Sequence, residues 1–226
     1  MAALVQQLVQ TWLSAPSVEV GQKATDVLTE LLEIDSPNRK PGMLNAEMNG
    51  GKLELRAESK GQGLLWRRIF GEKEIYGSIF QLCGEDSQLD EKQKSLAQAR
   101  LLRLLPRIAV LDLDALSTPA SVQNAQNGLL WWASTKMVDR SDVLMHITLL
   151  DYVVDLLGAF SLQLNQLTSS QVEALGGLVN EVMEGDGTIT KSLEALAMNE
   201  ETSPEMMGLL SSLKLKKSLP VRERTN

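Results

Sequence analysis

The chain has 226 residues, 43% of them hydrophobic and 23% charged, which is ordinary for a folded protein of one domain or two small ones. Its net charge of −7 argues against general nucleic-acid binding, because that requires Lys and Arg to neutralise phosphates. A single cysteine, Cys83, excludes an intramolecular disulfide and a cysteine-rich zinc site, and it favours a reducing compartment. We therefore expect a soluble protein of the cytoplasm or the nucleus, without a secretory signal or a transmembrane segment.

Two short helices are predicted at the N-terminus. Residues 2–13 and 17–34 both carry apolar side chains at helical spacing. Pro16 separates them, Ser17 is a suitable N-cap for the second helix, and Pro37 follows its end. The pattern predicts a helical hairpin over residues 1–34.

Residues 35–62 lose this periodicity. The segment contains two prolines, several glycines and mixed charges, which is typical of a long, disordered loop. Gly61 and Gly63 at its end match neither a P-loop nor a dinucleotide-binding motif, because Trp66 stands where the third glycine of the latter would be.

Trp66, Arg67 and Arg68 are a weak signal for nucleic-acid binding. The helix that begins near residue 63 is almost entirely apolar apart from the two arginines. We therefore favour a packed helix, with the arginines at the surface or paired with Glu72 and Glu74.

Helices continue along the rest of the chain, and no segment alternates as a strand would. Their recurrence predicts an all-α fold, an armadillo- or HEAT-like helical-repeat solenoid over residues 63–200; an irregular helical bundle is the alternative. Residues 201–226 are expected to form a short helix and a basic, flexible tail. The predicted helices cover residues 63–70, 73–83, 88–111, 123–138, 141–160 (with Asp139 or Ser141 as N-cap), 169–184, 189–198 and 204–215.

The helix predicted over residues 88–111 carries three arginines on one side. At 100° per residue, Arg100, Arg103 and Arg107 fall within roughly 60° of one another, and leucines occupy the other side. This stripe is either a solvated face or a row of guanidinium groups that binds carboxylates of a partner protein.

No catalytic, cofactor or metal site is predicted. His146 is the only histidine and has no nucleophile beside it in the sequence, so we expect it at the edge of a packed helix. Cys83 is expected to be a small buried residue rather than a reactive thiolate. Trp131 and Trp132 lie about 100° apart on a helix, so one is expected in the core and the other in a groove or at an interface.

Several extended segments resemble a known family. They are QKATDVL, LLEIDSP, GQGLLWRRIFGEKEIYGSIFQLC, LDEKQKSLAQARLLRLLPRIAVLD and MVDRSDVLMHITLLDYVVDLL, spread over residues 15–160. They are similar to the N-terminal half of a fungal family known both as an assembly chaperone of the proteasome regulatory-particle base and as a DNA mismatch-repair protein.

The resemblance implies an armadillo/HEAT-type solenoid with no active site, whose concave face holds the C-terminal domain of one base ATPase subunit. We accordingly expect a non-enzymatic assembly chaperone, monomeric, without cofactors and without direct binding to nucleic acid. The alternative is a DNA mismatch-repair accessory protein. The family has no motif that assigns contact residues here, and the arginine stripe is inferred from the sequence alone.

Overall fold

The computed structural model describes residues 2–38, 60–118 and 127–215, and this part of the chain is helical, without a strand. The all-α prediction is therefore confirmed for these residues. The helices are α1 (Ala2–Ser14), α2 (Val18–Asp35), α3 (Leu64–Gly71), α4 (Lys73–Cys83), α5 (Glu91–Ala109), α6 (Leu113–Ser117), α7 (Gly128–Thr135), α8 (Val143–Ser161), the 3-10 helix η1 (Leu164–Gln166), α9 (Ser169–Glu184), α10 (Gly187–Met198) and α11 (Pro204–Ser212).

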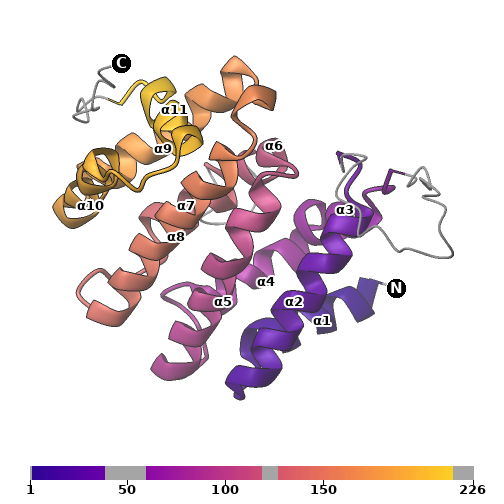
Figure 1. The fold of residues 1–226 in the computed structure, drawn as a ribbon. Coiled ribbons are helices and arrows are strands. Elements are labelled where there is room, and N and C mark those ends of the chain that lie inside the picture. The colour runs from indigo at the N-terminus through magenta and orange to yellow at the C-terminus, as the bar shows by residue number, and fades with distance from the viewer. Residues whose placement is uncertain (1, 39–59, 119–126, 216–226) are drawn as a thin grey trace, which may run out of the picture.

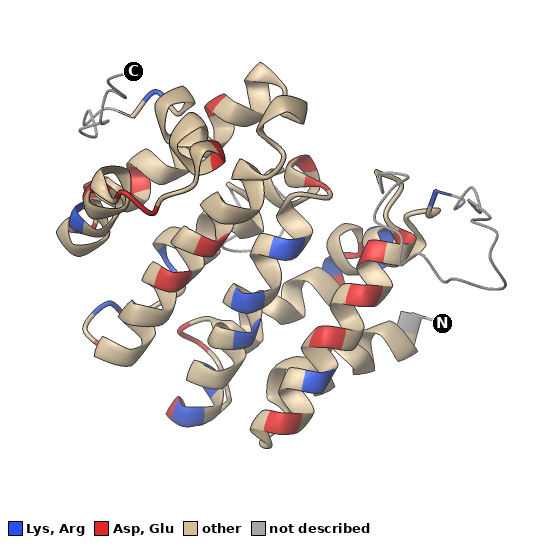
Figure 2. Ribbon diagram, in the orientation of Figure 1, with Lys and Arg blue, Asp and Glu red and all other residues tan. Residues whose placement is uncertain are grey.

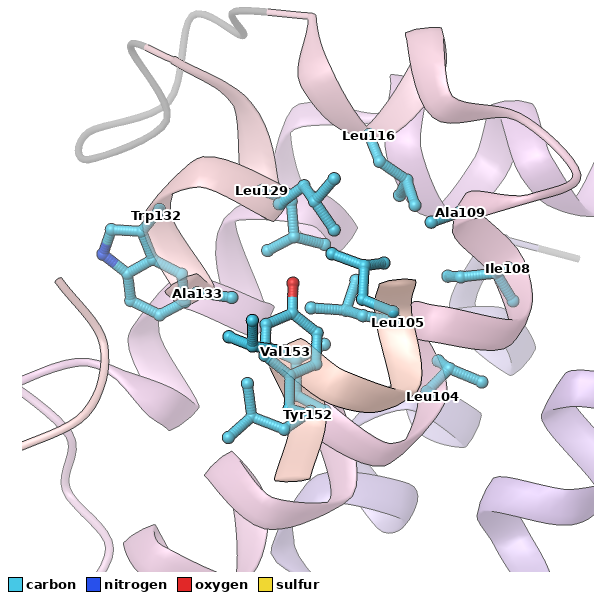
Figure 3. Close-up of a cluster of buried hydrophobic side chains, with 14 of the residues drawn as sticks. Leu104, Leu105, Ile108, Ala109, Leu116, Leu129, Trp132, Ala133, Tyr152 and Val153 are labelled. Carbon is cyan, nitrogen blue, oxygen red and sulfur yellow. The ribbon is translucent and has the colours of Figure 1, made fainter. Parts of the chain in front are cut away.

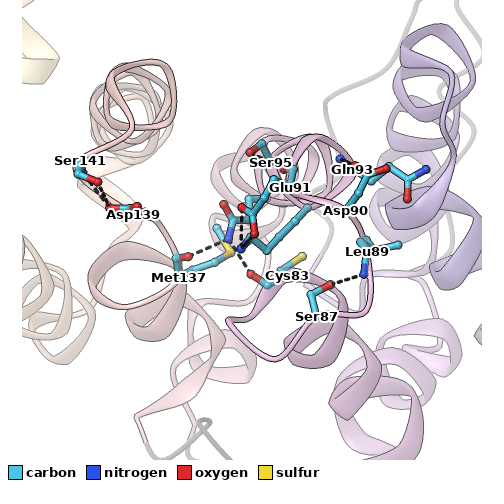
Figure 4. A network of polar contacts seen from close by, with 12 residues as sticks. Cys83, Ser87, Leu89, Asp90, Glu91, Gln93, Ser95, Met137, Asp139 and Ser141 are labelled. Atoms are coloured by element: carbon cyan, nitrogen blue, oxygen red, sulfur yellow. Dashed lines mark hydrogen bonds and ion pairs between the residues drawn. The ribbon is translucent and has the colours of Figure 1, made fainter.

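Most helices begin at a polar N-cap. Ser17 caps α2 as predicted, by accepting a hydrogen bond from the amide of Val20. The predicted caps of α8 are wrong, because Asp142 accepts the amides of Leu144 and Met145 there. Asp139 instead accepts from the backbone and hydroxyl of Ser141 in the preceding turn (Figure 4).

The helices form two layers (Figure 1). The long helices α2, α5 and α8 lie side by side in the front layer, and shorter helices lie behind them. Helices α10 and α11 pack against α8 on the side away from α5. Three contacts join α5 to the start and body of α2: Arg100 with Ser17, Arg103 with Gln22 and Arg107 with Glu33. Residue numbers rise together along the two helices, so α2 and α5 are parallel. The same order, two short helices followed by a helix of 19 residues, occurs two times along the chain: α3–α4–α5 and α6–α7–α8.

One aliphatic core connects the layers. Its buried residues run from Val5 in α1 to Leu213 after α11, so the N-terminal hairpin and the later helices share it. Figure 3 shows the central part, where side chains of α5, α6, α7 and α8 meet around Tyr152. The phenol of Tyr152 is within 3.0 Å of the hydroxyl of Ser134, which satisfies this buried polar group.

A chain of aromatic rings links the back helices α3, α4 and α7. It runs through Trp66, Phe70, Tyr76, Phe80 and Trp132, with successive centroids 5.1, 6.3, 5.1 and 4.5 Å apart. All the contacts are tilted or edge-on, the arrangements that the ring quadrupole favours. The predicted packing of the helix that begins near residue 63 is thus confirmed, with Trp66 only 5% exposed.

The two glycines before α3 serve a junction with the end of α2. The amide of Gly61 donates to the carbonyl of Ser36, and the amide of Gly63 to that of Asp35. The carboxylate of Asp35 then accepts the amides of Leu65 and Trp66 at the start of α3. Gly63 has φ +65, a conformation that favours glycine. Most of the predicted loop, residues 39–59, lies outside the described residues.

Gly61→Ala is expected to destabilise the protein by about 1–3 kcal/mol, because a Cβ at this position would lie 2.1 Å from the backbone carbon of Asp35. Gly71→Ala is the matched control, since nothing lies within 4 Å of its Cβ position. That change is expected to be neutral or to stabilise α3 by up to about 1 kcal/mol. Urea unfolding measures both; equal effects would contradict the close junction.

Helix α8 is the one helix among the described residues that is long and apolar enough to cross a membrane, with a mean hydropathy of 1.7. A core helix of a soluble protein meets the same criteria, so length and composition are weak grounds for a membrane span. Here α8 packs against α5, α10 and α11, and the absence of a transmembrane segment stays a prediction.

Candidate protein-binding groove

The arginine stripe does not lie open as a row of three. Arg100 is only 7% exposed, so it does not belong to a solvated face, and its role in binding a partner stays a prediction. Its guanidinium donates to the carbonyls of Trp12 and Leu13 at the end of α1, both at 3.1 Å, and to that of Ser17 at 3.0 Å. A cation at a helix C-terminus also offsets the negative end of the helix dipole. Burial lowers the pKa of Arg100 below the ordinary value of arginine.

Gly21 of α2 makes room for this guanidinium. A Cβ at position 21 would lie 2.0 Å from the Nε atom of Arg100, so glycine is required for the close approach of α2 and α5. The three carbonyls and this glycine explain why a charged side chain is buried between α1, α2 and α5. Arg100 is a structural residue that holds the N-terminal hairpin to α5.

Arg103 and Arg107 are exposed, but both contact α2. Arg103 donates to the side-chain oxygen of Gln22, and Arg107 forms an ion pair of 3.0 Å with Glu33. Figure 2 shows the acidic residues of α2 beside the basic residues of α5 on the front layer. The structure thus places two members of the stripe at the surface, where each retains donors that a partner could use.

A groove of about 270 Å³ crosses the front layer between α2, α5 and α8. Arg103 lies on α5, and Asp151 and Asp155 are one helical turn apart on α8. The wall toward α2 is formed by Val18 and Gln22. The other residues that line the groove are Leu96, Ala99, Arg100, Leu102, Thr148 and Tyr152.

The carboxylates of α8 give the groove an acidic side. Burial and the neighbouring charge of Asp151 raise the pKa of Asp155, while the positive charge of Arg103 acts in the opposite direction. The groove therefore offers a cation on α5 opposite anions on α8, above an apolar floor. Such a surface can hold a protein segment that combines apolar and charged side chains.

The nucleic-acid signal at Trp66 is not supported by its surroundings. The indole N–H donates to the carbonyl of Leu32 at 2.9 Å, and the ring is buried against Phe70. Arg68 pairs with Glu72, as predicted, and Arg67 donates to the carbonyls of Gln62 and Gly63. The indole is thus engaged within the protein and does not form an open platform for a base.

His146 lies at the edge of α8, as predicted, and contacts a buried carboxylate. Its Nε2 atom is 2.6 Å from Asp186, which also caps α10 through the amides of Thr188 and Ile189. Burial would raise the pKa of Asp186, but these donors together with His146 hold it below its usual value. Within the described residues, no three His, Cys, Asp or Glu side chains are placed to hold a metal ion.

Cys83 is fully buried, as predicted, and burial raises the pKa of its thiol. Its carbonyl accepts from the side-chain amide of Gln98, which also donates to the carbonyl of Met137, both at 2.8 Å (Figure 4). Trp132 is 4% exposed, whereas Trp131 is half-buried and donates to Glu181. The predicted division of the two tryptophans is confirmed.

No protein-family model matches the chain, and comparisons with curated proteins and with solved structures found no match. The family resemblance of the segments between residues 15 and 160 therefore stays a prediction.

The sequence reasoning did not find the groove itself. The spacing of Asp151 and Asp155 by four residues placed both carboxylates on one side of their helix, and this signal was available. The spacing does not identify the helix that lies opposite these carboxylates, because nothing in the sequence shows that α8 lies beside Arg103 of α5. Gln22 and Val18 carry no sequence signal for this role.

Proposed function

We propose that the chain is a non-enzymatic assembly chaperone of the proteasome regulatory-particle base, which binds the C-terminal domain of one ATPase subunit. The proposal takes the partner from the family resemblance, and the groove between α2, α5 and α8 supports protein binding. In this proposal α3–α4–α5 and α6–α7–α8 are repeats of an armadillo-like solenoid, and the groove lies on its concave face. The protein acts as a monomer in the cytoplasm and the nucleus.

The observation that carries this proposal is the mixed chemistry of the groove. Arg103 faces the carboxylates of Asp151 and Asp155 across the groove, and no described side chain covers the apolar floor between them. Binding of a folded domain buries such a floor and uses the charges for orientation. The engaged indole of Trp66 and the contacts of Arg103 and Arg107 with α2 weigh against a phosphate-binding surface.

The test is co-purification of the chain with the separately expressed C-terminal domain of each proteasomal ATPase. The native chain is expected to capture one domain. The double variant Asp151→Lys, Asp155→Lys is expected to lose at least tenfold in affinity, because it reverses the charge of one groove wall. The double variant Glu85→Lys, Asp86→Lys is the matched control, since both carboxylates are exposed on the turn after α4 and do not line the groove.

Capture of no domain by a chain with a helical circular-dichroism spectrum would overturn the proposed partner. If the groove variant captured the domain as well as the native chain does, the groove would not be part of the binding surface. Binding to duplex DNA that weakens steeply with salt would instead favour the mismatch-repair alternative.

A further inference from the structure

Helix α2 lies at one end of the front layer. It packs against α1, α3 and α5, and no further long helix of the front layer lies beyond it (Figure 1). Five large apolar side chains of α2 are nevertheless exposed. Val18 lines the groove, and the other four are Val20 at 51%, Val27 at 37%, Leu31 at 41% and Ile34 at 57%. We call the set Val20, Val27, Leu31 and Ile34 the α2 stripe. Single exposed leucines are common on proteins, but an aligned set on one helix is not explained by chance exposure.

The α2 stripe is separate from the face that α2 buries. At 100° per residue, its four members fall within roughly 60°, whereas the buried residues of α2 centre about 130° away. The buried set is Gly21, Thr25, Leu28, Thr29 and Leu32. The steps of seven, four and three residues along the stripe are those of a seam between two paired helices. The stripe therefore has the spacing needed to receive one further helix lengthwise.

An acidic row borders the α2 stripe. Glu19 and Glu30 are exposed beside it and Asp26 is half-buried, and one exposed cation, Lys23, lies among them. Asp26 accepts from Gln22, and neither Glu19 nor Glu30 has an ion-pair partner among the described residues. An apolar seam with unpaired carboxylates beside it matches a helix that has Lys or Arg next to its own apolar seam.

We propose that the α2 stripe is a docking surface for an amphipathic helix of a partner protein, with apolar residues at heptad spacing and Lys or Arg beside them. Charge complementarity selects this occupant over a second copy of the chain. In an antiparallel two-fold pair the acidic rows of the two copies meet, and in a parallel pair each row stays without cations. This surface is independent of the groove, because it lies on the outer edge of α2 and not on its border with α5.

The test uses two designed helical peptides of about three heptads, identical except that one has Lys and the other Glu beside a leucine seam. Fluorescence anisotropy with the full chain at low salt is expected to show at least about tenfold tighter binding of the Lys peptide. Leu31→Lys is expected to lose this binding, because it places a charge in the seam. Leu162→Lys is the matched control, since Leu162 is 77% exposed outside the stripe.

A second measurement reverses the charges beside the α2 stripe. The double variant Glu19→Lys, Glu30→Lys is expected to prefer the Glu peptide, which a purely apolar surface would not do. Equal binding of both peptides by the native chain, or no binding of either, overturns the proposal. So does a native dimer that Leu31→Lys dissociates, because the stripe would then join two copies. Binding that arises only after residues 39–59 are replaced by a Gly-Ser linker would assign the stripe to the chain's own segment and also overturn it.

Discussion

Arg100→Met is expected to lower the free energy of unfolding by about 2–4 kcal/mol, because it leaves buried carbonyls without donors. The carbonyls of Trp12 and Leu13 belong to the last turn of α1, where no further amide of the helix can reach them. Methionine fills much of the same volume, so the loss reports hydrogen bonds and charge more than packing. Urea unfolding followed by circular dichroism measures the change.

Arg107→Met is the matched control on the same helix. Its guanidinium is exposed and pairs with Glu33, so the expected cost is at most about 1 kcal/mol. Gly21→Ala provides a second route to the same site, because its Cβ would displace the guanidinium of Arg100 without deleting it. If Arg100→Met and Arg107→Met cost the same, Arg100 does not hold the hairpin to α5.

Trp132→Ala is expected to cost about 3–5 kcal/mol, the range for removing a large aromatic side chain from a core. The indole is 4% exposed and lies at the end of the aromatic chain, 4.5 Å from the centroid of Phe80. Its removal opens a cavity between α4 and α7 that the surrounding helices can fill only in part. The same unfolding experiment measures the effect, and a reduced midpoint with an unchanged denaturant slope is expected.

Trp131→Ala is the neighbouring control. Trp131 is half-buried beside a pocket between α7 and α9, and its indole N–H donates to Glu181. Loss of that hydrogen bond and of partial burial is expected to cost about 1–2 kcal/mol. A larger cost at position 131 than at 132 would contradict the assignment of Trp132 to the core.

Local patterns in the sequence were sufficient to predict most of the helices. Apolar spacing, Ser17 as a cap and the prolines near residues 16 and 37 located α1 and α2 almost to the residue. They failed at Leu113–Ser117, because five residues are too few to show a helical period. They also misplaced the cap of α8, since Asp139, Ser141 and Asp142 are all good caps and only the backbone geometry selects one.

The same reasoning identified several residues as structural. The single histidine, the single cysteine and the adjacent tryptophans lie where helical geometry and composition predict them. These predictions hold because they depend on which side of one helix a residue occupies. That property is set by the 100° step of the helix itself.

Only the tertiary structure decided what each side of a helix contacts. Arg100, Arg103 and Arg107 share one side of α5, yet the first is buried against three carbonyls and the others lie at the border with α2. The carbonyls at the end of α1 come from residues more than 80 positions away in the sequence. The partner of a polar side chain is fixed by the packing of helices, and helical periodicity carries no information about it.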